Sequence, residues 1–114
     1  MSLPRLRAVD DEVELLGFLS RVLLGRFEVV CATSAEAAWP LVEAGGFALL
    51  LADDGLPGER GAALIRRAQA RHPTLPTLLT SGYGGASGAQ LEKPFAAAEL
   101  VAAIDAALAQ GKGA

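Results

Sequence analysis

Short apolar runs alternate along this chain with longer segments of helical periodicity, and this alternation restricts its fold more than any other feature. Extended segments are predicted over residues 5–9, 27–32, 47–52, 74–80 and 90–92, and helices over 12–24, 35–44, 61–72 and 96–110. Strands separated by helices in this way form a parallel sheet that is covered on both faces. We therefore predict one α/β domain.

Two places interrupt the alternation. Pro40 lies within the second predicted helix, where it lacks a backbone donor and is expected to kink or shorten the helix. Residues 82–89 contain four glycines, and the stretch from there to Lys93 is too short for an ordinary crossover helix followed by a strand. We expect a mobile loop over residues 82–89.

Composition and charge exclude several classes of protein. The 114 residues are 52% hydrophobic, which is enough for one domain with a buried core. The net charge of −3 and the lack of a basic cluster argue against direct binding of nucleic acid. No apolar run approaches the ~20 residues that cross a membrane, and the first residues do not read as a signal peptide. With Cys31 as the only cysteine, we expect a cytoplasmic protein.

Polar side chains stand at the predicted strand ends. Asp10 and Asp11 follow the first strand, Asp53 follows the third, Ser81 follows the fourth, and Lys93 follows the fifth. In an open parallel sheet the carboxyl ends of the strands form the ligand crevice. Carboxylates suit a magnesium ion, and an aspartate beside it can act as a nucleophile. This inventory predicts Mg²⁺ beside an aspartate that accepts a phosphoryl group.

The pair Asp10–Asp11 has a second interpretation, because acidic side chains are also favoured in the first turn of a helix. Taken alone, the pair fits both interpretations equally. A second pair, Asp53–Asp54, follows another apolar run, where helix capping does not require it. Crowded carboxylates raise each other's pKa unless a cation lies among them. The two pairs together favour a divalent cation.

Four motifs in this order resemble the response-regulator receiver domain. The first motif is the acidic pair Asp10–Asp11, and the second is Asp53 with Pro57 four residues later. The third is the run from Thr74 to Tyr83, in which a predicted strand ends in a hydroxyl residue followed by a small residue. The fourth is Lys93-Pro94-Phe95. The resemblance covers essentially residues 5–110, and we predict a receiver domain over residues 4–110. It implies a flavodoxin-like, doubly wound sheet of five parallel strands in the order 2-1-3-4-5, with a fourth helix that is short or replaced by a loop.

The same resemblance implies roles for individual residues. Asp53 would be the phosphoacceptor, and Ser81 and Lys93 would bind the phosphoryl oxygens, with Thr80 as the nearest alternative to Ser81. A cis peptide bond is expected between Lys93 and Pro94.

The magnesium ligands follow from the resemblance as well. Asp11, Asp53 and the carbonyl group of Gly55 would hold Mg²⁺, and Asp10 would assist through water. Phosphorylation would draw the loop around Ser81 toward the site and shift the domain between two arrangements.

The function implied is a phosphorylation-dependent switch in two-component signalling. A histidine kinase or phosphotransfer protein would supply the phosphoryl group, and a downstream protein that the sequence does not name would respond. Such a domain catalyses only its own phosphoryl uptake and loss, so we expect no independent enzyme activity. An interaction module of the same fold that is never phosphorylated is the alternative, and retention of all the site residues speaks against it. A phosphatase with an aspartyl nucleophile is a second alternative. Such enzymes usually need a second acid two residues after the nucleophile, and the glycine at position 55 speaks against this alternative.

One position departs from the receiver pattern. Many receivers carry an aromatic switch residue three positions before the lysine, and here that position is Gln90. Tyr83 is a candidate substitute, although it fits a simple packing role equally well.

Three further residues receive structural interpretations. Cys31 is expected in the core as a small apolar residue, and Trp39 is expected to be partly buried. His72, before Pro73, is expected to cap a helix at the surface.

Overall fold

The structure, a computed structural model, describes residues 2–82 and 89–112. Its elements are β1 (Arg5–Val9), α1 (Val13–Val22), β2 (Glu28–Ala32), α2 (Ala35–Ala44), β3 (Leu49–Asp53), α3 (Gly61–Arg71), β4 (Thr77–Ser81), β5 (Leu91–Glu92) and α4 (Ala97–Lys112). All neighbouring strands are parallel, and the sheet order is β2-β1-β3-β4-β5. The predicted flavodoxin-like, doubly wound fold with strand order 2-1-3-4-5 is confirmed.

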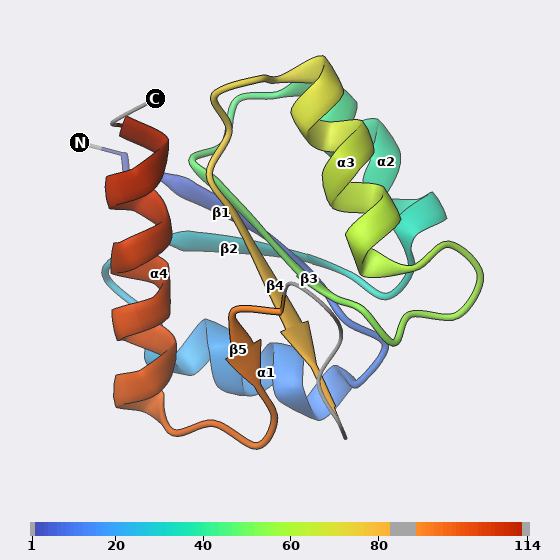
Figure 1. Ribbon diagram of the computed structural model, residues 1–114. Coiled ribbons are helices and arrows are strands. Elements are labelled where there is room, and N and C mark those ends of the chain that lie inside the picture. Colours follow the sequence, from blue (N-terminus) through green and yellow to red (C-terminus); the bar gives the residue numbers. More distant parts are fainter. Residues whose placement is uncertain (1, 83–88, 113–114) are drawn as a thin grey trace.

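The helices form two layers around this sheet, with α1 and α4 on one face and α2 and α3 on the other (Figure 1). The central strand β3 is buried along its whole length, and its residues alternate between the two cores. Leu49 and Leu51 pack under α1 and α4, whereas Leu50 and Ala52 pack under α2 and α3. The period of two in a strand explains this division. Each buried leucine contributes about 1.5–3 kcal/mol, so β3 anchors the residue that ends it.

Helix α2 begins where the sequence indicates, because the Ser34 hydroxyl accepts a hydrogen bond of 3.1 Å from the backbone N–H of Ala37. It then continues through Pro40 to Ala44. Pro40 therefore does not shorten the helix, contrary to one of the two expected effects. Helix α1 begins and ends inside its predicted limits, and Gly25 lies beyond its end with a φ of 84°.

The expectation for Cys31 was wrong, since this cysteine is exposed. It lies on β2, one of the two edge strands of the sheet, which has a neighbouring strand on one side only. Trp39 is partly buried, as expected, with the Arg67 guanidinium carbon 4.0 Å from its ring centroid. His72 is the C-terminal cap of α3 and is half-buried, with its Nε2 atom 2.9 Å from the Val42 carbonyl oxygen.

The segment between β4 and β5 holds nine residues, from 82 to 90. Its described residues, Gly82, Ala89 and Gln90, belong to no helix or strand. The remainder of the predicted mobile loop, residues 83–88, lies outside the described residues. So does Tyr83, the candidate aromatic substitute.

Candidate functional site

A cleft of about 780 Å³ opens at the carboxyl ends of the strands. It is lined by Asp11, Glu12, Leu15, Phe18, Asp53, Gly55, Gly82, Lys93, Pro94 and Phe95. Most of these residues come from the loops that follow β1, β3, β4 and β5, whereas Asp53 ends β3 and α1 contributes Leu15 and Phe18. This is the crevice expected for a doubly wound sheet. Four of the predicted site residues, Asp11, Asp53, Gly55 and Lys93, therefore line one cavity.

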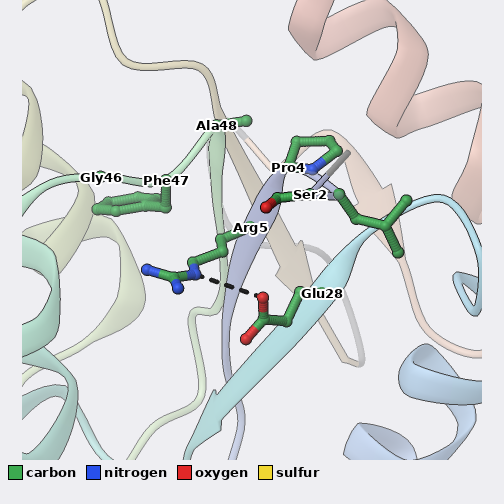
Figure 2. Close-up of a pocket in the computed structure, with 8 residues that line it drawn as sticks. Ser2, Pro4, Arg5, Glu28, Gly46, Phe47 and Ala48 are labelled. Atoms are coloured by element: carbon green, nitrogen blue, oxygen red, sulfur yellow. Dashed lines mark hydrogen bonds and ion pairs between the residues drawn. The ribbon is translucent and has the colours of Figure 1, made fainter.

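A second hollow of about 510 Å³ lies at the opposite, amino-terminal ends of the strands, where β1 and β2 begin and the chain enters β3 (Figure 2). Arg5 and Glu28 face each other there, with the Arg5 Nε atom 3.4 Å from a Glu28 carboxylate oxygen. Both side chains are about half exposed. None of the predicted site residues lines this second hollow.

Asp53 is the last residue of β3, so its backbone is fixed by the sheet ladder opposite Thr80 of β4. Its side chain is almost buried, and the Thr80 hydroxyl donates a hydrogen bond of 3.3 Å to its Oδ1 atom. Gly55 lies beside the same carboxylate, because a Cβ atom at that position would be 3.3 Å from Asp53 Oδ2. The fold thus presents one carboxylate at the floor of the cleft.

Three carboxylates converge around this point. Oxygen atoms of Asp10, Asp11 and Asp53 all lie within 4.8 Å of one another. Asp10 is fully buried, and burial raises its pKa although the backbone N–H of Glu12 donates to its Oδ1 atom at 2.8 Å. Oxygen donors at this spacing suit a small hard cation, which would also relieve the repulsion between the carboxylates. The residues present therefore fit the magnesium ion that the sequence predicts.

Lys93 joins the carboxylates from the other side of the cleft. Its Nζ atom lies 2.9 Å from Asp10 Oδ2, 3.4 Å from Asp53 Oδ1 and 2.6 Å from Glu12 Oε1. Burial alone would lower the pKa of Lys93, but the hydrogen bonds with Glu12 and Asp10 outweigh it, and the pKa lies above its usual value. Lys93 is therefore a fixed positive charge. The peptide bond between Lys93 and Pro94 is cis, as expected.

The two candidate hydroxyl groups of β4 differ in position. Thr80 is the register partner of Asp53 and bonds to it, whereas the buried Ser81 hydroxyl has no hydrogen-bond partner among the described residues. Successive residues of a strand point to opposite faces, so these two hydroxyl groups cannot both face Asp53 while β4 stays regular. The structure brings Thr80 to Asp53. Ser81 stands next to the site with an unused donor.

Asp54 does not face the cleft, although it neighbours Asp53. Its carboxylate is bound by the Arg60 guanidinium, and its Oδ1 atom accepts a hydrogen bond of 3.1 Å from the backbone N–H of Ala62. The hydrogen bond from Arg60 lowers the pKa of Asp54 despite its burial. Asp54 is therefore occupied at the start of α3.

Sequence reasoning missed the function of Gly61, the first residue of α3. A Cβ atom there would lie 2.2 Å from the backbone oxygen of Asp53. Only glycine permits this approach, which fixes the start of α3 against the end of β3. A glycine at the first helical position, where it is a poor helix former, was the available signal. Glu12 was also missed as a partner of Lys93.

Gln90, the residue at the usual aromatic position, is tied to β4. The side-chain oxygen of Gln90 accepts a hydrogen bond of 2.7 Å from the backbone N–H of Leu79. The backbone N–H of Gln90 donates a hydrogen bond of 3.0 Å to the Leu79 carbonyl oxygen. Gln90 is therefore held against β4 through both its side chain and its backbone.

Comparisons with known proteins agree with this fold. No family model matches the chain. The response regulator protein FleR of Pseudomonas aeruginosa is 36% identical over 104 residues, which cover 82% of this chain and 22% of FleR. The transcriptional regulatory protein TctD of Salmonella typhimurium is 31% identical, over 96% of this chain and 54% of TctD. The chain thus spans about a fifth to about half of the length of these curated relatives.

Solved structures give a closer correspondence. A CheY-like receiver domain protein from Methanospirillum hungatei superposes with a TM-score of 0.87 at 26% identity, over 98% of both chains. The receiver domain of NtrX from Brucella abortus has a TM-score of 0.80 and 30% identity, over 91% of this chain and 98% of the other. The fold and the site define a receiver domain of two-component signalling. The chain belongs to the response-regulator receiver family.

Within residues 2–82 and 89–112, no helix combines the length and the hydropathy of a membrane span.

Proposed function

We propose that this domain is a phosphorylation-dependent switch that accepts one phosphoryl group on Asp53. One observation carries the proposal: a nearly buried carboxylate at the floor of a cleft lies 3.4 Å from the Lys93 ammonium group and within 4.8 Å of two further carboxylates. A lone nucleophile beside a fixed cation and a set of oxygen donors is the arrangement that phosphoryl transfer requires.

Asp11 and Asp53 would hold Mg²⁺, with the carbonyl group of Gly55 as a further ligand and Asp10 acting through water. When bound, the ion neutralises charge on the phosphoryl oxygens and aligns the donor. Calorimetry should detect this binding, and Asp11→Ala should weaken it strongly. Equal binding by Asp11→Ala and the parent would contradict the ligand set.

In the transfer step, a carboxylate oxygen of Asp53 attacks the phosphorus atom of phosphohistidine. The bond between phosphorus and the imidazole nitrogen breaks, the imidazole leaves with the electron pair of that bond, and Asp53 becomes an acyl phosphate. Lys93 binds a phosphoryl oxygen by a charge-assisted hydrogen bond. The Ser81 hydroxyl, which is buried and has no hydrogen-bond partner among the described residues, is available to bind another if the end of β4 moves.

We infer a histidine kinase or phosphotransfer protein as the donor and a downstream protein as the responder. The domain catalyses only its own gain and loss of the phosphoryl group and works in the cytoplasm. The domain has few basic residues and a net charge of −3, which argues against direct binding of nucleic acid. Any effect on nucleic acid would be exerted through other domains or proteins.

The proposal is tested by intact mass after incubation with acetyl phosphate and Mg²⁺. The parent should gain the mass of one phosphoryl group, and hydroxylamine should remove it, as expected for an acyl phosphate. Asp53→Asn should show no gain, and chelation of the metal should prevent labelling of the parent. An unlabelled parent would instead support an interaction module of the same fold.

A further inference from the structure

Glu12 bridges the two loops that form the mouth of the cleft. Glu12 directly precedes α1, and its Oε1 atom lies 2.6 Å from the Nζ atom of Lys93. Lys93 is 81 positions later in the chain. The Glu12 side chain is 62% exposed, whereas that of Lys93 is 15% exposed. The ion pair therefore holds the lysine from the solvent side, while Asp10 and Asp53 hold it from the interior.

Helix α1 does not depend on the side chain of Glu12 for its start. The backbone carbonyl of Glu12 accepts the first helical hydrogen bond, from Leu16 at 3.1 Å, but its side chain makes no capping bond. Glutamate is also a poor residue at this position, compared with serine or aspartate. The side chain is committed to Lys93 instead.

The charge balance of the cleft gives this contact a consequence. Three carboxylates, those of Asp10, Glu12 and Asp53, lie 2.6–3.4 Å from the ammonium group of Lys93, and Asp11 lines the same cleft. A phosphoryl group on Asp53 brings further negative charge and needs the same ammonium group. Since Glu12 lies nearest to Lys93 and takes no part in the proposed metal site, it is the carboxylate that competes with the phosphoryl group.

We propose that Glu12 is a gating residue that holds Lys93 in the unphosphorylated domain and must release it before the lysine can bind a phosphoryl group. The inference rests on the proposed function of Asp53. It makes Glu12 a positioning residue that acts through Lys93 and lowers both the rate of phosphorylation and the affinity for a phosphoryl group.

The test compares Glu12→Gln with a matched control, Glu14→Gln. Both substitutions remove one negative charge from the start of α1, but Glu14 forms no ion pair among the described residues. The probes are Mg²⁺ with beryllofluoride, for affinity by calorimetry, and acetyl phosphate, for labelling rate by intact mass. Glu12→Gln should bind beryllofluoride more tightly and label faster, each by about two- to fivefold, the effect expected of an ion pair with one exposed partner.

Salt separates competition from a change in folding. The advantage of Glu12→Gln over the parent should shrink as ionic strength rises, since screening weakens the pair in the parent. Glu14→Gln should match the parent throughout. Slower or unchanged labelling of Glu12→Gln, with a labelled parent, overturns the gating inference alone. A parent that takes up neither probe overturns the proposed function and the inference with it.

Discussion

The Asp54 carboxylate is bound by the Arg60 guanidinium, six residues later, and this contact turns it away from the cleft that its neighbour Asp53 enters. The two adjacent aspartates thus have different surroundings. Asp54 is bound at the start of α3, whereas the Asp53 carboxylate lines the cleft.

Asp54→Asn should therefore leave phosphoryl labelling by acetyl phosphate intact but destabilise the domain by about 1–3 kcal/mol, because a partly buried, charge-assisted hydrogen bond is lost. The pKa of Asp54 is lowered in the folded state, so its stabilisation is present above about pH 3.9 and is lost as the pH falls through the folded value. Urea unfolding measures the effect. Asp105→Asn, which removes an exposed partner of Arg26, is the control and should cost about 0–1 kcal/mol.

Asp10→Asn should raise the stability of the metal-free domain by about 1 kcal/mol, or about 4 °C in the thermal midpoint. Burial raises the pKa of Asp10, so its ionised form disfavours folding at neutral pH, and this cost vanishes as the pH falls through the raised pKa. The variant should also lose part of the stabilisation by Mg²⁺. Thermal unfolding with and without Mg²⁺ measures both effects. An undiminished Mg²⁺ shift in the variant would remove Asp10 from the metal site.

Gly61→Ala should destabilise the domain by about 1–3 kcal/mol or more and slow labelling of Asp53, because the added Cβ atom would meet the Asp53 carbonyl at 2.2 Å. Gly17→Ala is the matched control. A Cβ atom at position 17, within α1, meets only the flexible end of Arg21 at 3.4 Å and should stabilise the helix by about 0.5–1 kcal/mol. Urea unfolding and intact mass decide. If both variants were equally stable, the close approach at Gly61 would not constrain the fold.

Ser81→Ala should leave the stability almost unchanged, because the Ser81 hydroxyl has no partner to lose within the described residues. It should weaken beryllofluoride binding about tenfold, since a hydrogen bond to a charged group would be missing. Thr80→Val should do the reverse, losing about 1 kcal/mol of stability with its bond to Asp53 while binding beryllofluoride well. Calorimetry and urea unfolding distinguish the two. The opposite pattern would transfer the phosphoryl-binding role to Thr80.

Much of the fold was readable from the sequence, because it depends on local regularities. Apolar runs bounded by glycine and proline predicted the strands, and helical periodicity predicted the four described helices to within a few residues at each end. The placement of Asp10, Asp11, Asp53 and Lys93 at strand ends was enough to bring them together, because all the strands are parallel and their carboxyl ends meet at one edge. The strand order came from the resemblance to receiver domains, which the structure supports.

Contacts between distant segments were decided only in the tertiary structure. Glu12 meets Lys93 because the loops after β1 and β5 close over one cleft, and Gly61 meets Asp53 because α3 turns back against its own strand. Thr80, and not Ser81, bonds to Asp53 because the register of β3 and β4 places Thr80 opposite Asp53. Successive side chains of a strand point to opposite faces, so Ser81 does not share that position. Cys31 is exposed because β2 forms an edge, a property of the whole sheet. Local periodicity determines which face a residue prefers, whereas long-range packing determines which partner it finds there.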